Sequence, residues 1–438
     1  MGRIRIKGKT RRGTILLAGL PLLAALLLAA AVTAFLTGCE DIGLRATIDD
    51  LTTGYEWVKV AKLTAPTRLG NEYFGYSVSI DDDFAIVGAF NNSETNTGQG
   101  KAYIYRNNDG KWSYLTTLEA SDGAAGHGFG WSVAVSGNYA VVGAPGYAVG
   151  QGSAYLYQWN GSSWITPTAL QTDNGRLEIP GGASPVEMGY SVSISGKYAV
   201  VGAPGENSNV GATYIYYKDQ DGSNYWGYQL RLTTGEGDFD RYGESVSIYQ
   251  DYLLSGAKSD DEGETNSGAA YLYKRSGVNW PQVSTRIKNA SPKSDEYFAS
   301  SVSLCDEHML FGAPNENKSY VYKYTSNSWK YLSSIESTSI EPVDRYGYSV
   351  SISEDFALIG ASYHDTKSVP NSGASYIFSR EDDWDQFGTI ISSDPEADDE
   401  LGASVSITED YLIVGIPYDN NGGTSNCGAA LVYEKREK

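Results

Sequence analysis

The sequence predicts an all-β protein, a seven-bladed β-propeller with four-stranded blades, and three observations support this. A seven-residue motif recurs seven times along the 438-residue chain. Each copy is followed by the same succession of short β-rich segments, separated by Gly, Asn and Asp turn residues. The seventh copy lacks its last segment, and a segment of that kind precedes the first copy. Supersecondary units that repeat and close on themselves in this way are typical of a propeller.

The repeated motif consists of a large apolar residue, a glycine, one further residue and a run resembling Ser-Val-Ser-Ile, as in residues 74–80. Its seven copies begin at Phe74, Phe129, Met188, Tyr242, Phe298, Tyr346 and Leu401. Successive glycine positions lie 48 to 59 residues apart, with Ala299 in place of the fifth glycine. Similarity at such a period indicates a repeat architecture, with the motif as the first strand of each blade.

Three more strands are expected in each repeat. The second is an apolar run that ends in Gly-Ala, as in residues 84–89, and its lack of alternation suits a strand buried on both faces. The third is rich in tyrosine, as in residues 102–105. The fourth opens with tryptophan, at Trp112, Trp164, Trp226, Trp280, Trp329 and Trp384. Small side chains in the first strand and large ones in the last match a wedge that narrows toward the propeller axis.

The chain ends are predicted to meet in the last blade. The seventh repeat ends at residues 433–438 without a tryptophan strand. Trp57 lies 18 residues before Gly75, which is also the spacing from Trp112 to Gly130. The segment 55–63 should therefore supply the missing strand, leaving no open sheet edge between the first and last repeats.

These motifs, Phe-Gly followed by Val-Gly-Ala-Pro in seven copies, resemble FG-GAP repeats, the unit of the integrin α-subunit propeller and of many bacterial surface proteins. The resemblance covers residues 55–438. Ala299, Lys258, Ser362 and Ile416 replace consensus Gly, Pro or Ala positions. The resemblance implies a cell-surface module that recognises or adheres to a protein or glycan ligand.

Residues 1–38 are predicted to be the signal peptide of a bacterial lipoprotein. Six Lys and Arg residues within positions 3–12 precede an uncharged apolar run of 23 residues, 14–36. The sequence Leu36-Thr37-Gly38-Cys39 resembles a lipobox, which makes Cys39 the expected lipidation site and residues 39–54 a tether. An uncleaved membrane anchor is the alternative, because the run is long enough to span a bilayer. Both interpretations place the protein in the cell envelope, outside the cytoplasm, and leave the choice between inner and outer membrane open.

Composition limits the expected partners. The formal net charge is −20, and loss of the six leader cations leaves 27 basic against 53 acidic side chains. Such a surface disfavours nucleic acid and anionic membranes, although it also simply promotes solubility. Cys305 and Cys427 fall in the fifth and seventh repeats and are expected to be free thiols.

No cofactor or metal site is predicted. Integrin-like blades often hold calcium between strands 1 and 2, but that connection is a tight turn in all seven repeats. Acidic residues precede the motif by two positions at Glu72, Asp240, Glu296, Asp344 and Asp399. These acids either form a ring of cation ligands or, the interpretation favoured by their repetition, accept backbone N–H bonds as a repeated structural feature.

The sequence favours a non-catalytic function. The three histidines lie in different repeats, and no hydrolase or metalloprotease motif occurs. A polysaccharide hydrolase with a carboxylate pair remains an alternative, as does a purely structural envelope protein. The predicted ligand site lies in the longest connection between strands 4 and 1, between Trp164 and Gly189. There Arg176, Leu177 and Ile179 combine charged and apolar groups on the face of the long acidic loops.

Overall fold

The computed structural model describes residues 4–5, 14–15, 54–166, 175–177, 179, 186–219, 225–234, 239–283, 286–381 and 383–438. Cys39, and the predicted leader and tether apart from residues 4–5, 14–15 and 54, lie outside this set.

The chain divides into two compact units, Met1–Glu56 with Arg436–Lys438, and Trp57–Lys435. In the first, β1 (Ile4–Arg5) pairs with β2 (Thr14–Ile15). None of the helices within the described ranges is long and apolar enough to cross a membrane.

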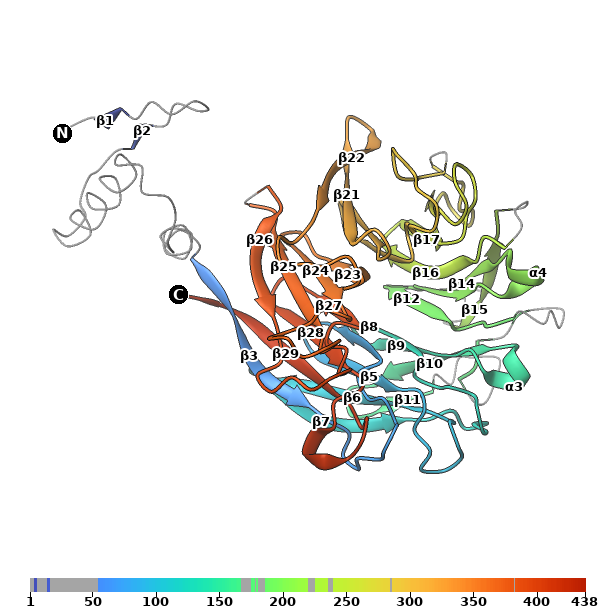
Figure 1. Ribbon diagram of the computed structural model, residues 1–438. Coiled ribbons are helices and arrows are strands. Elements are labelled where there is room, and N and C mark those ends of the chain that lie inside the picture. The colour runs from blue at the N-terminus through green and yellow to red at the C-terminus, as the bar shows by residue number, and fades with distance from the viewer. Residues whose placement is uncertain are drawn as a thin grey trace. The chain divides into compact units, whose positions relative to one another are not determined.

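The second unit is a seven-bladed propeller, as predicted, and its first three blades are four-stranded antiparallel sheets (Figure 1). The first contains β4 (Ser77–Ile80), β5 (Phe84–Ala89), β6 (Lys101–Asn108) and β7 (Lys111–Leu118). The second contains β8 (Ser132–Ser136), β9 (Tyr139–Ala144), β10 (Ser153–Trp159) and β11 (Trp164–Ile165). The third contains β12 (Ser191–Ser195), β13 (Tyr198–Ala203), β14 (Ala212–Lys218) and β15 (Trp226–Leu232).

The other four blades follow in sequence order. The fourth contains β16 (Tyr242–Tyr249), β17 (Tyr252–Ala257) and β18 (Ala269–Lys274). The fifth contains β19 (Ser301–Leu304), β20 (His308–Ala313), β21 (Lys318–Thr325) and β22 (Ser328–Ile335). The sixth contains β23 (Tyr346–Ile352), β24 (Phe356–Ala361), β25 (Ala374–Ser379) and β26 (Asp385–Ile390). The seventh contains β27 (Val405–Ile407), β28 (Tyr411–Ile416), β29 (Ala429–Glu437) and, from the N-terminal side, β3 (Tyr55–Leu63). Single helical turns, α3 (Tyr147–Gly150), α4 (Glu206–Asn209) and η1 (Asn421–Gly423), interrupt connections between second and third strands.

The outer edge of the fourth blade is less regular than the others. Its outermost segment bridges β18 at two isolated pairs, Tyr273 with Gln282 and Ala270 with Ile287. Pro281 follows the tryptophan that should open this strand, and proline has no N–H for a strand ladder. The segment therefore occupies the fourth position without forming a continuous strand in the described residues.

The seventh blade is closed as the sequence predicts, because β3 lies next to β29 in its sheet. The first strands of neighbouring blades contact one another in a complete circuit that returns from β27 to β4. The Trp57 ring also packs edge-on against Phe356 of the sixth blade, with 5.3 Å between ring centroids. Closure of the ring therefore joins elements from opposite ends of the chain.

Neighbouring blades touch through backbone at the glycine of each second strand. A Cβ added at Gly88 would lie 2.0 Å from the Gly130 carbonyl oxygen of the next blade, and the equivalent distance at all seven junctions is 1.9–2.2 Å. The motif serines add hydrogen bonds: Ser77 Oγ donates to the same carbonyl at 2.8 Å. Ser79 Oγ accepts the N–H of Val135 at 3.1 Å. The small residues therefore serve close packing and also hydrogen bonding between blades.

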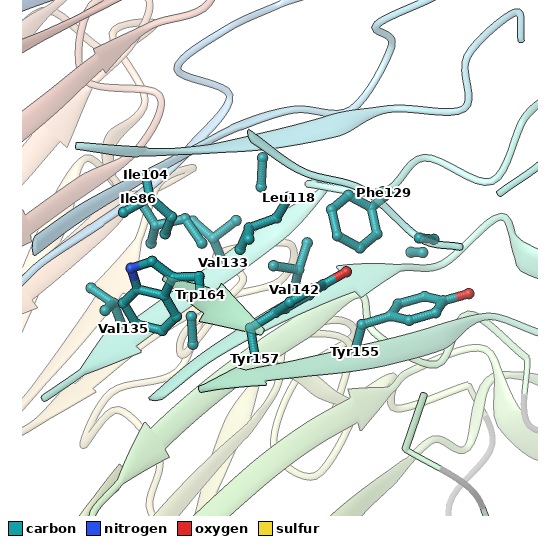
Figure 2. Packing of buried hydrophobic residues seen from close by; sticks show 14 of the residues in the cluster. Ile86, Ile104, Leu118, Phe129, Val133, Val135, Val142, Tyr155, Tyr157 and Trp164 are labelled. Atoms are coloured by element: carbon teal, nitrogen blue, oxygen red, sulfur yellow. The ribbon is translucent and has the colours of Figure 1, made fainter. Parts of the chain in front are cut away.

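The apolar core lies between the blades. Second strands such as β5 and β13 are buried along their whole length, which confirms the interpretation of their unbroken apolar pattern. Figure 2 shows one such cluster, where Ile86 and Ile104 of the first blade meet Val133, Val142 and Trp164 of the second. Burying aromatic and branched side chains between every pair of blades provides most of the apolar stabilisation.

The two described cysteines are unpaired, as predicted, and both are buried. Burial raises the pKa of the Cys305 thiol to about 12. A thiol that stays protonated at neutral pH is a poor nucleophile, so the role of Cys305 is to fill space in the core.

Candidate functional site

Every blade begins with the same four-residue turn. In the first blade these four residues are Tyr73, Phe74, Gly75 and Tyr76. The large apolar residue of the motif is second, and the motif glycine, or Ala299 in the fifth blade, is third. In all seven turns, the N–H of the fourth residue donates to the carbonyl oxygen of the first at 3.0–3.1 Å. We call the first and fourth residues turn position 1 and turn position 4.

Turn position 1 has a left-handed backbone in every blade, with φ between 54° and 66°. Its occupants are Tyr73, Gly128, Glu187, Arg241, Tyr297, Arg345 and Glu400. Only one is glycine, although a non-glycine residue in this conformation costs about 1–3 kcal/mol. Six blades therefore keep a side chain at a strained position.

Turn position 4 lines a single cavity in all seven blades. Its occupants are Tyr76, Trp131, Tyr190, Glu244, Ser300, Tyr348 and Ala403. The cavity has a volume of about 580 Å³, within the range of about 300–1,000 Å³ usual for small-molecule sites. Because every blade contributes to its wall, it lies on the propeller axis, on the face of the long connections. We call it the axial pocket.

An unbroken series of aromatic rings, which we call the aromatic arc, runs beside the axial pocket, and four of its members, Tyr418, Tyr76, Trp131 and Tyr190, line the cavity. Neighbouring ring centroids are 4.5–5.6 Å apart, within the range of favourable aromatic pairs. The members, in order of contact, are Tyr418, Tyr73, Phe90, Tyr76, Trp131 and Tyr190. Burial raises the pKa values of Tyr76 and Tyr190, so their hydroxyls remain protonated hydrogen-bond donors at neutral pH.

The fourth blade contributes a compensated charge cluster. The buried Glu244 carboxylate accepts a hydrogen bond from Arg241 Nε at 2.6 Å and pairs with Lys258 through its other oxygen. Arg241 also pairs with Glu187 at 3.0 Å. Because each charge has an opposite partner, the cluster stiffens this part of the wall and leaves little net charge.

The sixth and seventh blades contribute less constrained polar groups. The Arg345 guanidinium lies over the Tyr363 ring, 4.1 Å from its centroid, and makes no ion pair with the residues that the structure describes. Burial raises the pKa of Glu400 to about 7, although the charge of Arg345 favours its ionised form. Glu400 can therefore donate or accept a proton near neutrality, and Arg345 retains N–H donors for a ligand.

A family model for the FG-GAP repeat matches residues 57–105, 112–157, 173–216, 226–273, 335–378 and 384–433. The chain belongs to the FG-GAP repeat family. No curated protein matches the chain. Four of the matched segments begin at the tryptophan near the start of a fourth strand, and all six end in the third strand of a blade, which agrees with the closure by β3.

The unmatched stretch 274–334 carries most of the fifth blade of the FG-GAP propeller. Here Ala299 replaces the motif glycine and keeps a left-handed backbone, with a φ of 64°. Asn317 replaces the glycine that precedes β21, and its side-chain oxygen accepts the N–H of Tyr346 at 3.0 Å. These local substitutions preserve the blade while weakening its sequence signature.

The structural interpretation of the repeated acids is confirmed where their bonds are described. Glu72 accepts the N–H of Leu69 at 3.0 Å, and Asp344 and Asp399 accept the corresponding N–H groups at 2.8 Å. In the second repeat, His127 Nδ1 accepts the N–H of Ala124 at 3.1 Å in the same way. These side chains therefore fix the loop that enters each blade. The described ranges contain no cluster of three His, Cys, Asp or Glu side chains able to hold a metal ion.

Arg176, Leu177 and Ile179 lie at the outer edge of the second blade and do not line the axial pocket. Leu177 is buried in the core beside Met188 and Trp226, and its N–H donates to Ala154. Arg176 pairs with Asp122 at 3.4 Å and stacks on Tyr147. Ile179 packs against the same core. Their role in ligand binding stays a prediction, but their contacts show that they support the blade.

The axial-pocket residues were not identified from the sequence. The sequence does contain a feature that could have identified them. Turn position 4 occurs once in each of the seven repeats, yet its occupant changes between aromatic, acidic and small residues. A structural position would keep one residue type, as the neighbouring Ser-Val-Ser run nearly does.

Proposed function

We propose that this FG-GAP propeller is a non-catalytic binding or adhesion module whose protein or glycan ligand is held at the axial pocket. The observation that carries the proposal is the set of seven turns with one backbone geometry and different side chains. Fold alone would not support it, because propellers serve many functions. A rigid scaffold that presents variable aromatic and charged groups around one cavity is the arrangement of a recognition site.

We further propose that the module is anchored by a lipid on Cys39 at the cell envelope, outside the cytoplasm. The basic leader, the apolar run and the lipobox-like residues support this location. A short tether before residue 55 would leave the propeller close to its membrane and free to reach envelope or extracellular ligands.

A pair of carboxylates in the same pocket supports a hydrolase as the second candidate. Glu244 is paired with Arg241 and Lys258, whereas burial raises the pKa of Glu400 to about 7. Two carboxyl groups in different environments are the basis of acid–base catalysis on glycosides. In this alternative, Glu400 is the general acid, and Glu400→Gln would abolish release of reducing sugar from a polysaccharide.

The binding proposal is tested with the full-length chain in detergent, immobilised and exposed to envelope extract and to a glycan array. The double variant Tyr190→Ala/Tyr348→Ala removes two rings from the axial pocket. The matched control, Tyr114→Ala/Tyr331→Ala, removes two rings that are 45% and 50% exposed on the outer strands β7 and β22. Loss of ligand in the first variant alone supports the proposal, whereas equal binding by both variants contradicts it.

A further inference from the structure

The charges that line the axial pocket balance. Its wall contains two acids, Glu244 and Glu400, and two bases, Lys258 and Arg345. Glu244 and Lys258 are already paired with each other. An ionic ligand would therefore meet at most one excess charge, a positive one when Glu400 is protonated, and an anionic ligand would also be repelled by the net charge of −20 on the whole chain.

The remaining groups suit a ligand that has both apolar faces and hydroxyl groups. The aromatic arc offers π surfaces, on which the C–H face of a sugar ring packs well. Arg345 supplies donors that the described residues do not occupy, and Glu400 supplies an acceptor or a donor. A few polar groups placed among aromatic rings are what fixes the orientation of a small polar ligand.

The shape of the site favours the end of a chain over a broad surface. The pocket is a cavity of about 580 Å³, enclosed by the first turns of all seven blades. A folded protein surface cannot enter a cavity of this kind, whereas a terminal sugar or a single side chain can. A terminal sugar has a C–H face for the aromatic arc and several hydroxyls for both polar groups.

We propose that the axial pocket binds the end of a neutral glycan, with the aromatic arc stacked against a sugar ring and with Arg345 and Glu400 bonded to its hydroxyls. This inference rests on the proposed binding function and specifies its ligand class. Trp131 is the largest of the arc rings that line the pocket, and it lies between Tyr76 at 4.9 Å and Tyr190 at 5.6 Å, measured between centroids. It is therefore the ring whose loss should weaken sugar binding most.

The test presents full-length protein in detergent to an array of neutral oligosaccharides and of oligosaccharides that carry uronic or sialic acids. A neutral oligosaccharide that binds is then titrated by calorimetry. Trp131→Ala is expected to weaken its binding at least tenfold, whereas Trp131→Phe, which keeps a ring, should retain most of the affinity. Tyr114→Ala serves as the matched control and should bind like the wild type. Melting temperatures verify that each variant is folded.

Four outcomes would overturn the inference. Binding of acidic glycans alone would contradict the neutral class, and a neutral glycan that binds folded Trp131→Ala as tightly as the wild type would contradict the site. Capture of an envelope protein that depends on Tyr190 and Tyr348, with no glycan bound, would refute the glycan inference and leave the proposed binding function intact. No pocket-dependent binding of either kind would refute both.

Discussion

The backbone N–H of Ile80, in the first strand of the first blade, donates a 3.2 Å hydrogen bond to the hydroxyl of Ser406, in the first strand of the seventh. The same bond joins five of the other six pairs of neighbouring blades at 3.1 Å. At the remaining junction, the position of the accepting serine holds Ala134, which has no hydroxyl. The junction between the seventh and first blades, which closes the ring, is therefore built like the others.

Gly415→Ala should open this closing junction. Its new Cβ would lie 2.0 Å from the carbonyl oxygen of Gly75, which is backbone and can move only if the two blades separate. We expect a loss of about 1–3 kcal/mol or more of unfolding free energy, measured by urea denaturation. Gly388→Ala is the control, because its Cβ would meet nothing nearer than 3.9 Å, and it should be tolerated. Equal stability of the two variants would contradict the packing of the closed ring.

Leu177→Ala should destabilise the fold without affecting binding at the axial pocket. Leu177 is 2% exposed in the core of the second and third blades, and removal of a buried leucine side chain typically costs about 2–5 kcal/mol. Thermal unfolding measures the loss, and ligand binding is measured below the melting temperature. A variant as stable as the wild type but deficient in binding would instead support the ligand site predicted from the sequence.

Glu296→Gln should stabilise the protein above neutral pH. Burial, together with the neighbouring Glu316, raises the pKa of Glu296 to about 7. Between its unfolded pKa of about 4.3 and that value, the folded state holds a proton that the unfolded state has lost, so stability falls as pH rises. Glutamine cannot ionise, and its amide can donate to Glu316. We expect a gain of about 2–3 kcal/mol at pH 8 that disappears near pH 4.5.

The control for this prediction is Glu336→Gln, because Glu336 lines the same small cavity as Glu296 and Glu316, at the connections of the fifth blade and separate from the axial pocket. Its side chain is 45% exposed and pairs with Lys318 at 3.1 Å, so its removal should change stability little at either pH. Urea denaturation at pH 4.5 and pH 8 provides the comparison. A Glu296→Gln variant whose stability relative to the wild type is the same at both pH values would refute the assignment of a proton to this buried carboxyl.

Cys39→Ala should abolish lipid attachment. The prediction follows from the lipobox-like sequence that ends at Cys39, and it is measured by metabolic labelling with a fatty acid in a bacterial host. Cys427→Ala removes a buried thiol of the seventh blade and should leave labelling unchanged. Label that persists in the Cys39→Ala protein would rule out the proposed anchor.

The blade architecture could be predicted because each blade repeats the same physical requirements. Glycine is needed where second strands such as β5 touch the next blade, and large rings are needed at the wide outer edge. The spacing of Trp57 from Gly75 therefore predicts the closing strand from the sequence alone. The fifth blade was also recognisable, although Ala299 replaces its glycine, because the Ser-Val-Ser run and the aromatic residues remained.

The axial pocket could not be predicted in the same way. Its turns are separated by about fifty residues in sequence, and only ring closure brings Tyr76 and Tyr418 to the same cavity. The long connection of the second blade was also misleading, because it resembles a free loop. After β11 ends at Ile165, the segment around Leu177 returns to the edge of β10 and buries an apolar side chain that the sequence alone suggested was available to a partner.

The most direct measurement of the central claim compares ligand affinity and stability in Arg345→Gly. Arg345 occupies turn position 1 with a φ of 55°, where Gly128 shows that glycine is accepted. Relief of the left-handed strain should offset the entropic cost of glycine, about 0.5–1 kcal/mol, so the melting temperature should stay the same or rise. Binding of the neutral glycan should weaken at least tenfold.

The control is Arg380→Ala, which removes an exposed arginine on the opposite face. Arg380 pairs with Asp355, and its loss should change neither binding nor the pocket. A folded Arg345→Gly protein that binds as tightly as the wild type would contradict the assignment of the axial pocket as the ligand site.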